Sequence, residues 1–101
     1  MADGSEQNPY TWDAFPESLL VSESNAANLT YYNFTIAEAG TYVFTFDISD
    51  TWYNIANAEG TVLTQGSKTD SFEANLAAGT YRIGLGNWDA TAPLTVTASV
   101  K

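Results

Sequence analysis

The chain of 101 residues contains no cysteine and no histidine. The lack of cysteine excludes disulfide bonds, thiolate nucleophiles and zinc–thiolate sites, and the lack of histidine excludes an imidazole base and a histidine-ligated metal. Basic residues are also scarce: three stand against twelve acidic ones, for a formal net charge of −9. A protein that binds nucleic acid needs several cations to release counterions from the phosphates, so we expect no nucleic-acid partner.

Long apolar runs are missing as well. No run approaches the ~18 residues of a membrane span, and no basic segment precedes an apolar one, so we predict no membrane insertion. Charged residues make up 15% of the chain, against about 25% in an average soluble domain. Thr, Ser and Asn must therefore supply the polar surface, and a composition rich in Thr and aromatic residues is typical of β-structure. We expect an extracellular or bacterial cell-surface module, although a cytosolic domain can share this composition.

We predict one domain, because about 100 residues fit the usual size of a folding unit. Residues 1–16 are expected to be an irregular N-terminal segment punctuated by Pro9 and Pro16, with residues 1–6 disordered. Residues 17–101 form the domain, in which strand signals recur about every eight to twelve residues. That spacing predicts an all-β fold, an antiparallel β-sandwich, jelly-roll-like, of about eight strands. The expected strands cover 18–22, 30–36, 41–48, 50–56, 61–65, 71–76, 80–85 and 94–100.

Apolar residues alternate along the predicted strands with a period of two, which places one set inside the sandwich. The clearest case is 41–48, whose aromatic residues and Ile48 are expected to face the core. A second pattern is the near-repeat Ala-Gly-Thr-Tyr at residues 39–42 and 78–81. In both copies a glycine follows an apolar strand end and a tyrosine begins the next inward row. We therefore expect two equivalent hairpins, produced by duplication or by convergent turn chemistry.

Three segments resemble motifs of small bacterial extracellular β-sandwiches, namely the pre-peptidase C-terminal-like domains and the related jelly-roll carbohydrate-binding modules. Residues 32–44 resemble their YxFTxxxAGTYxF hairpin, 50–63 their DT…YDADGxxL hairpin, and 72–83 the FxxxLxAGTYxIxL element that follows. The resemblance extends over residues 30–100 and implies the sandwich fold. Asn57 replaces the usual aspartate of the central hairpin, so the resemblance gives less support for the calcium binding seen in some such folds.

Catalysis is not expected. Twelve carboxylates make a catalytic pair arithmetically available, but a domain of this size rarely encloses the cleft that glycoside hydrolysis needs. Most of the acidic residues fall in predicted loops or at outward strand positions, as Glu73 does. The chain also lacks a glycine-rich phosphate loop and a nucleophile–base arrangement. We therefore predict a protein that is not an enzyme and has no cofactor.

Calcium is the one ion for which the sequence offers candidate ligands. Ca²⁺ prefers carboxylate and carbonyl oxygens, and Asp47 and Asp50 flank a predicted loop, while Asp70 and Asp89 lie in others. No run matches an EF-hand or a nonapeptide calcium repeat, and turn aspartates commonly bond their own backbone. We expect no metal, with a structural calcium at Asp47 and Asp50 as the weaker alternative.

The three tryptophans stand outside the inward rows, which Phe, Tyr, Ile and Leu already fill. Trp52 and Trp88 lie in surroundings rich in Asn and Asp, and Trp12 lies in the irregular segment. Exposed aromatic rings are typical of sugar recognition, because the C–H groups of a pyranose stack on the ring while amides and carboxylates bond its hydroxyls. The alternative is that a loop tryptophan only closes the open end of the sandwich.

The predicted carbohydrate-binding residues each carry a stacking ring or a hydrogen-bonding group close to a tryptophan, or, in one case, on an outward strand position: Trp52, Tyr53, Trp88, Trp12, Asn54, Asn87, Asp89 and Arg82. Arg82 has a default alternative, which is an ion pair with a carboxylate of a neighbouring strand.

The sequence thus predicts a non-catalytic carbohydrate-binding module that attaches a larger secreted or cell-surface bacterial protein to a polysaccharide. The resemblance and the low charge slightly favour an α-glucan such as starch over a β-glucan, and the module is expected to be a monomer within a multidomain protein. Two alternatives stay open, a ligand-free structural or adhesive spacer domain and a calcium-dependent β-sandwich module. The spacer is distinguished from the binding module by whether Trp52 and Trp88 are exposed on the same face.

Overall fold

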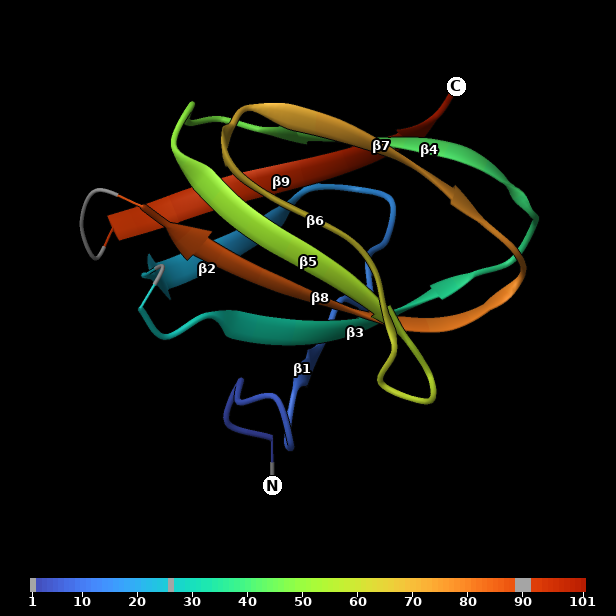
Figure 1. Ribbon diagram of the computed structural model, residues 1–101, viewed down its shortest axis with the longest axis horizontal. Helices are drawn as coiled ribbons and strands as arrows, with labels where there is room; N and C mark the ends of the chain where they lie inside the picture. The colour runs from blue at the N-terminus through green and yellow to red at the C-terminus, as the bar shows by residue number, and fades with distance from the viewer. Residues whose placement is uncertain (1, 26, 89–91) are drawn as a thin grey trace.

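The computed structural model describes residues 2–25, 27–88 and 92–101, which form two facing β-sheets (Figure 1). Sheet A has the strand order β1-β3-β8-β5-β6, and sheet B has the order β2-β9-β4-β7. The all-β prediction is confirmed, with one more strand than expected. No helix in the described ranges is long and apolar enough to span a membrane. The strands are β1 (Tyr10–Thr11), β2 (Leu19–Ser24), β3 (Thr30–Ile36), β4 (Gly40–Phe46), β5 (Thr51–Asn57), β6 (Val62–Thr69), β7 (Ser71–Leu76), β8 (Gly79–Asn87) and β9 (Ala92–Val100).

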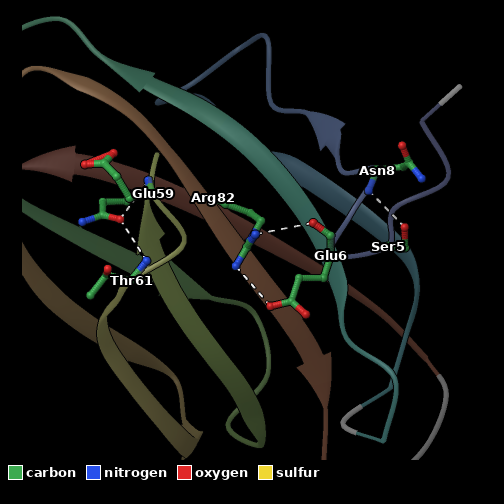
Figure 2. Close-up of polar contacts among 7 residues, drawn as sticks. Ser5, Glu6, Asn8, Glu59, Thr61 and Arg82 are labelled. Atoms are coloured by element: carbon green, nitrogen blue, oxygen red, sulfur yellow. Dashed lines mark hydrogen bonds and ion pairs between the residues drawn. The ribbon is translucent and has the colours of Figure 1, made fainter.

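The strands pair as one long hairpin that has been rolled up. β5 pairs with β6, β4 with β7, β3 with β8 and β2 with β9, all antiparallel and nested around the β5–β6 turn. At that turn Asn57 Oδ1 accepts bonds from the N–H groups of Glu59 and Thr61 (Figure 2), and Gly60 takes a φ of 85° that favours glycine. Nested pairs split between two sheets are the jelly-roll arrangement, so the predicted jelly-roll sandwich is confirmed.

The two Ala-Gly-Thr-Tyr segments are the places where the rolled ribbon crosses between the sheets. β3 in sheet A passes into β4 in sheet B, and β7 in sheet B passes into β8 in sheet A. The crossings lie side by side (Figure 1), because Ile36 pairs with Gly79 and Gly40 pairs with Leu76. The expectation of two hairpins is therefore wrong. The segments are equivalent corners of one ribbon, since each joins strands that belong to different sheets.

Each corner is held by its tyrosine. The Tyr42 hydroxyl donates to the Glu38 carbonyl oxygen at 2.6 Å, and the Tyr81 hydroxyl donates to the Ala77 carbonyl oxygen at 2.8 Å. In both bonds the acceptor lies four residues before the tyrosine, in the connection between two strands. Each hydroxyl therefore satisfies a carbonyl oxygen outside the strands. Both rings are buried and also extend the inward rows of β4 and β8.

The core is a layer of aromatic and aliphatic side chains between the sheets. Phe34 of β3 and Phe44 of β4 meet edge to face with centroids 5.9 Å apart, and Phe44 stacks on Phe72 at 4.8 Å. The predicted inward rows are buried over most of their length. Ile48, which follows the end of β4, is only partly buried, and Val100, the last residue of β9, is 64% exposed.

The N-terminal segment belongs to this core. Trp12 is 2% exposed, lies 5.9 Å from Phe34 between ring centroids, and donates from Nε1 to the Glu17 carbonyl at 2.8 Å. The Trp12 N–H bonds to Asn33 in sheet A, and the Pro16 carbonyl accepts the N–H of Ala98 in sheet B. The segment therefore crosses between the sheets and covers one side of the core.

The segment is also ordered before Trp12. The N–H groups of Asp3 and Gly4 both donate to the Asn8 carbonyl oxygen, and the Gly4 carbonyl accepts the N–H of Tyr31. The expectation that residues 1–6 are disordered is therefore wrong for residues 2–6. A short irregular segment has no apolar period, and this is why the sequence pattern missed its place in the fold.

The corner bonds give a first prediction. Tyr42→Phe and Tyr81→Phe should each lower the free energy of unfolding by about 1 kcal/mol, because each leaves a carbonyl without its donor. Denaturant unfolding measures the change. The control is Tyr10→Phe, at a ring that is 41% exposed and outside the corners, which should change stability by less than about 0.5 kcal/mol. Equal stability of all three variants would contradict the role of the corners.

Candidate functional site

The outer face of sheet A carries the candidate site. On β8 the buried row is Tyr81, Ile83 and Leu85, so alternation turns the intervening residues outward. Two of these are glycines, and the strand is followed by Trp88. On β5, Trp52 pairs with Gly86 and Asn54 pairs with Gly84. The glycines leave room above the sheet beside the larger β5 side chains.

The centre of the site is a stacked tryptophan pair. The rings of Trp52 and Trp88 have centroids 4.8 Å apart and planes 24° apart. The Trp88 N–H donates to the Asp50 carbonyl oxygen at 2.7 Å, which continues the β5–β8 ladder beyond Asn87. Trp88 is 41% exposed and Trp52 is half-buried. Both tryptophans therefore lie on one face and form a single aromatic surface.

A hollow of about 480 Å³ lies beside this surface, lined by both tryptophans together with Asn25 and Ala27. The Asn25 side chain is involved in shaping this wall, because its Oδ1 accepts the N–H of Ala27 at 2.8 Å. The wall comes from the β2–β3 connection, which lies against β8 where Gly86 has no side chain. Sequence reasoning missed this wall, because nothing local in the β2–β3 segment indicates which strand it will rest on.

Strand β6 brings a cation to the pair. The β5–β6 register shifts between Thr51 and Tyr53, so β6 has an extra residue at this level. Lys68 lies in this bulge with a left-handed φ of 54°, and its Nζ sits 5.2 Å from the ring centroid of Trp88. Lys68 is a second component that the sequence did not predict, since the bulge that turns it onto the ring depends on the pairing register.

The other half of the outer face is a closed stack. Figure 2 shows Arg82 directed at Glu6, with Nη2 3.2 Å from Oε2 and Nη1 donating to the Glu6 carbonyl at 3.4 Å. The guanidinium carbon lies 5.3 Å from the centroid of the Tyr31 ring, which rests against Gly84. Arg82 therefore holds the N-terminal segment on sheet A. Its ion pair was expected, but the partner comes from that segment instead of a neighbouring strand.

Three predicted carbohydrate-binding residues are corrected by their burial. Trp12 packs in the core, and Tyr53 is 7% exposed with its ring stacked 3.7 Å from Phe72 between centroids. Asn87 is 9% exposed and points to the inner side, opposite to Gly86. The physical reason for the last two is shared. Their segments continue as strands, so a residue next to an outward tryptophan or glycine must face inward.

The remaining predicted positions divide as follows. Asn54 lies on the outer face, next to Tyr31 above Gly84. Asp89 lies outside the described residues. The calcium candidate Asp47 accepts the Thr95 N–H through Oδ1 at 2.9 Å. Within residues 2–25, 27–88 and 92–101, no group of three or more His, Cys, Asp or Glu side chains could hold a metal ion.

Asp3 and Tyr32, both in the described part of the chain and away from the tryptophan pair, have shifted pKa values. Hydrogen bonds from Ser5 hold the pKa of the exposed Asp3 carboxyl below its usual value. Burial raises the pKa of the Tyr32 phenol, and the neighbouring Tyr10 adds to the effect. Neither shift bears on the tryptophan surface, which consists of uncharged rings and a lysine.

No protein-family model and no curated protein matches the chain. Its fold is similar to that of the pre-peptidase C-terminal domain of a collagenase from Bacillus anthracis, with a TM-score of 0.63 at 11% identity over 83% of this chain and 89% of that one. The fold is also similar to that of PliG of Aeromonas hydrophila, a periplasmic inhibitor of g-type lysozyme, with a TM-score of 0.55 at 15% identity over 91% of this chain and 96% of that one. A chain in a structure of accessory secretory proteins 1, 2 and 3 of Streptococcus pneumoniae has a TM-score of 0.50 at 13% identity, over 83% of this chain and 79% of that one.

At these identities the similarity concerns the fold. The sandwich of the pre-peptidase C-terminal-like domains, expected from the hairpin motifs, is confirmed at that level.

The contact between β8 and the wall of the hollow gives a second prediction. A β-carbon at Gly86 would lie 2.5 Å from the Asn25 carbonyl oxygen and 2.6 Å from Leu29 Cδ2. Gly86→Ala should lower the free energy of unfolding by about 1–3 kcal/mol and change the emission of the tryptophan pair, because backbone must move. Gly40→Ala is the control, since its β-carbon would find no atom closer than 3.8 Å. Similar stability of the two variants would show that the wall does not rest on Gly86.

Proposed function

We propose that the chain is a non-catalytic carbohydrate-binding module whose ligand stacks on the Trp52–Trp88 pair. The observation that supports this most is the pair itself, two indoles stacked on one outer face with Trp88 41% exposed. Tryptophan used only for packing is buried, as Trp12 is. A spacer needs no exposed indole, whereas stacking on a pyranose needs at least one exposed aromatic ring.

The chemistry of the surface suits a sugar. The hollow beside the pair falls within the about 300–1,000 Å³ typical of small-molecule sites. An indole edge or face contacts the C–H groups of a pyranose, and Asn25 in the wall of the hollow is the polar residue beside its hydroxyls. Asn54 lies on the same face two residues from Trp52, but next to Tyr31 above Gly84 and outside the lining of the hollow, where Asn25 is the residue with an amide. The site is shallow and apolar, which fits binding without catalysis.

The surroundings of such a module follow from the same proposal. We propose that it works outside the cell or on the bacterial surface, as a monomeric part of a larger protein. The structurally similar lysozyme inhibitor is a periplasmic protein, which agrees with this proposal. Among neutral glycans, the preference for an α-glucan such as starch over a β-glucan stays a prediction.

The stacking proposal predicts the effect of removing the rings. Trp88→Ala should weaken binding to the best glycan of a neutral panel by about tenfold, the effect of losing a central stacking ring, and Trp88→Phe should weaken it less. Trp52→Ala should also weaken binding, because Trp52 supports Trp88. Affinity electrophoresis on starch, β-glucan and other plant polysaccharides measures retention, and tryptophan fluorescence reports contact.

The matched control is Tyr10→Ala, which removes an equally exposed ring from β1. It should leave retention unchanged. Melting curves confirm that each variant folds. Free migration of the wild type on every glycan, with unchanged emission, would overturn the proposal in favour of the spacer.

A chelator separates the calcium-dependent alternative from the proposed module. Calcium that held the fold together would make Tm fall on addition of EDTA. We expect no shift, because Asp47 already accepts the Thr95 N–H and the described residues bring no third acidic ligand to it and Asp50. A clear fall in Tm, reversed by Ca²⁺, would contradict this expectation.

A further inference from the structure

The three basic side chains differ in their partners. Arg82 is paired with Glu6 and Lys101 with Glu73. Lys68 forms no ion pair with any residue that the structure describes, and its ammonium lies over the Trp88 ring instead. In a chain with a net charge of −9, a cation without a carboxylate partner is unusual. The ring face of Trp88 thus already holds an ammonium group.

Three aspartates belong to the segments at this end of the sandwich. The Asp50 carbonyl oxygen accepts the N–H of Trp88, and the Asp70 carbonyl oxygen accepts the N–H of Phe46, the residue before Asp47. Asp70 also follows Lys68 by two residues. These aspartates and the net charge of −9 favour a cation over an anion as a ligand at this end.

Tryptophan is the aromatic side chain that best attracts a cation over its face. A ligand that stacks on Trp88 must share the ring with Lys68 or displace it. A neutral sugar that displaces Lys68 loses the cation–π contact and replaces it only with C–H contacts. A sugar that carries its own ammonium group restores that contact, and it also gains from the negative surroundings.

We infer that the Trp52–Trp88 site binds sugars that carry an ammonium group, the chemistry of glucosamine units in an amine-bearing polysaccharide. The sugar ammonium takes the position of Lys68 over Trp88, and the pyranose lies in the neighbouring hollow. Lys68 acts as an internal competitor that holds the ring until a cationic ligand arrives. This inference rests on the proposed carbohydrate binding and specifies its ligand class.

The experiment compares two ligands that differ only in charge. Glucosamine oligomers and N-acetylglucosamine oligomers of equal length are titrated at about pH 5.5, where the free amine is protonated and ordinary carboxyls are ionised. Tryptophan fluorescence measures affinity. The free amine should bind more tightly than the acetylated oligomer, and its advantage should shrink as salt is added, because exposed charges are screened.

The Lys68→Gln variant tests the competitor directly. It should raise the affinity for both oligomers about two- to fivefold, the strength of an exposed cation–π contact, because either ligand must displace Lys68 from the ring. The glucosamine oligomer should gain more, because the variant also removes a like charge. Lys101→Gln is the matched control. It removes the same charge at the opposite end of β4, where Lys101 bonds Thr41 and pairs with Glu73. It should not change either affinity measurably in moderate salt.

Lys68 lies in a bulge, so a second variant guards against a folding defect. Lys68→Asn removes the charge with a residue that adopts the left-handed region more readily, and it should behave as Lys68→Gln does. Melting curves for both variants confirm that the sandwich is intact before affinities are compared.

The outcomes separate the two proposals. Equal affinity for both oligomers, or weaker amine binding in Lys68→Gln, overturns the ammonium inference while Trp88-dependent binding of neutral glycans leaves the carbohydrate proposal standing. No binding of any glycan by the folded wild type overturns both. Oligolysine that binds the pair more tightly than glucosamine oligomers overturns the assignment to a glycan, because the cation would then come from a protein.

Discussion

The double corner of the rolled ribbon is the constraint on which the other features depend. There two chain segments cross between the sheets together, with Ile36 opposite Gly79 and Gly40 opposite Leu76. The tyrosine bonds fix where each new strand begins. A register shift of one residue would turn every side chain of a strand to the other face, so this corner decides which residues of β8 are inside. The position of Trp88 outside the sandwich follows from it.

The face that results has two unlike halves because of the glycines of β8. At Gly84 the missing side chain admits the Tyr31 ring, which carries Arg82 and closes that half. At Gly86 it admits the backbone of Asn25 instead, and the tryptophan pair stands beside it. The same residue type thus permits a packed, charge-neutral stack in one place and an open aromatic hollow in the other. Binding is proposed only where an indole is left exposed.

Charge has a larger part in this molecule than solubility alone requires. The net charge of −9 looks featureless in composition, and a surface short of lysine needs some such excess to remain soluble. The fold places the few cations at defined points, two of them over aromatic rings at Tyr31 and Trp88. Only one of these two is matched by a described carboxylate. That difference is the basis of the proposed ammonium-binding site at the tryptophan pair.

The core was largely predictable from sequence, because burial follows the strict period of two along each strand. The rows on β3, β4 and β8 show this, since Phe34, Phe44 and Ile83 lie where alternation puts them. The same rule, applied one strand further, corrects Tyr53 and Asn87. Tyr53 was expected at the surface because it adjoins Trp52, although it lies in the expected strand 50–56, and Asn87 was expected there because the expected strand ended at residue 85. In the structure both residues lie on strands next to an outward position, so both face inward.

By itself, the sequence determined the fold class and the inward rows, and it singled out Trp52 and Trp88 as candidate binding residues. Local period and composition carry that information. Only the tertiary structure decided that Trp12 is a core residue, that the two repeated segments are adjacent corners, and that Lys68 lies over Trp88. Each of these depends on which distant strands pair and in what register. Non-local pairing of this kind leaves no local pattern in the chain.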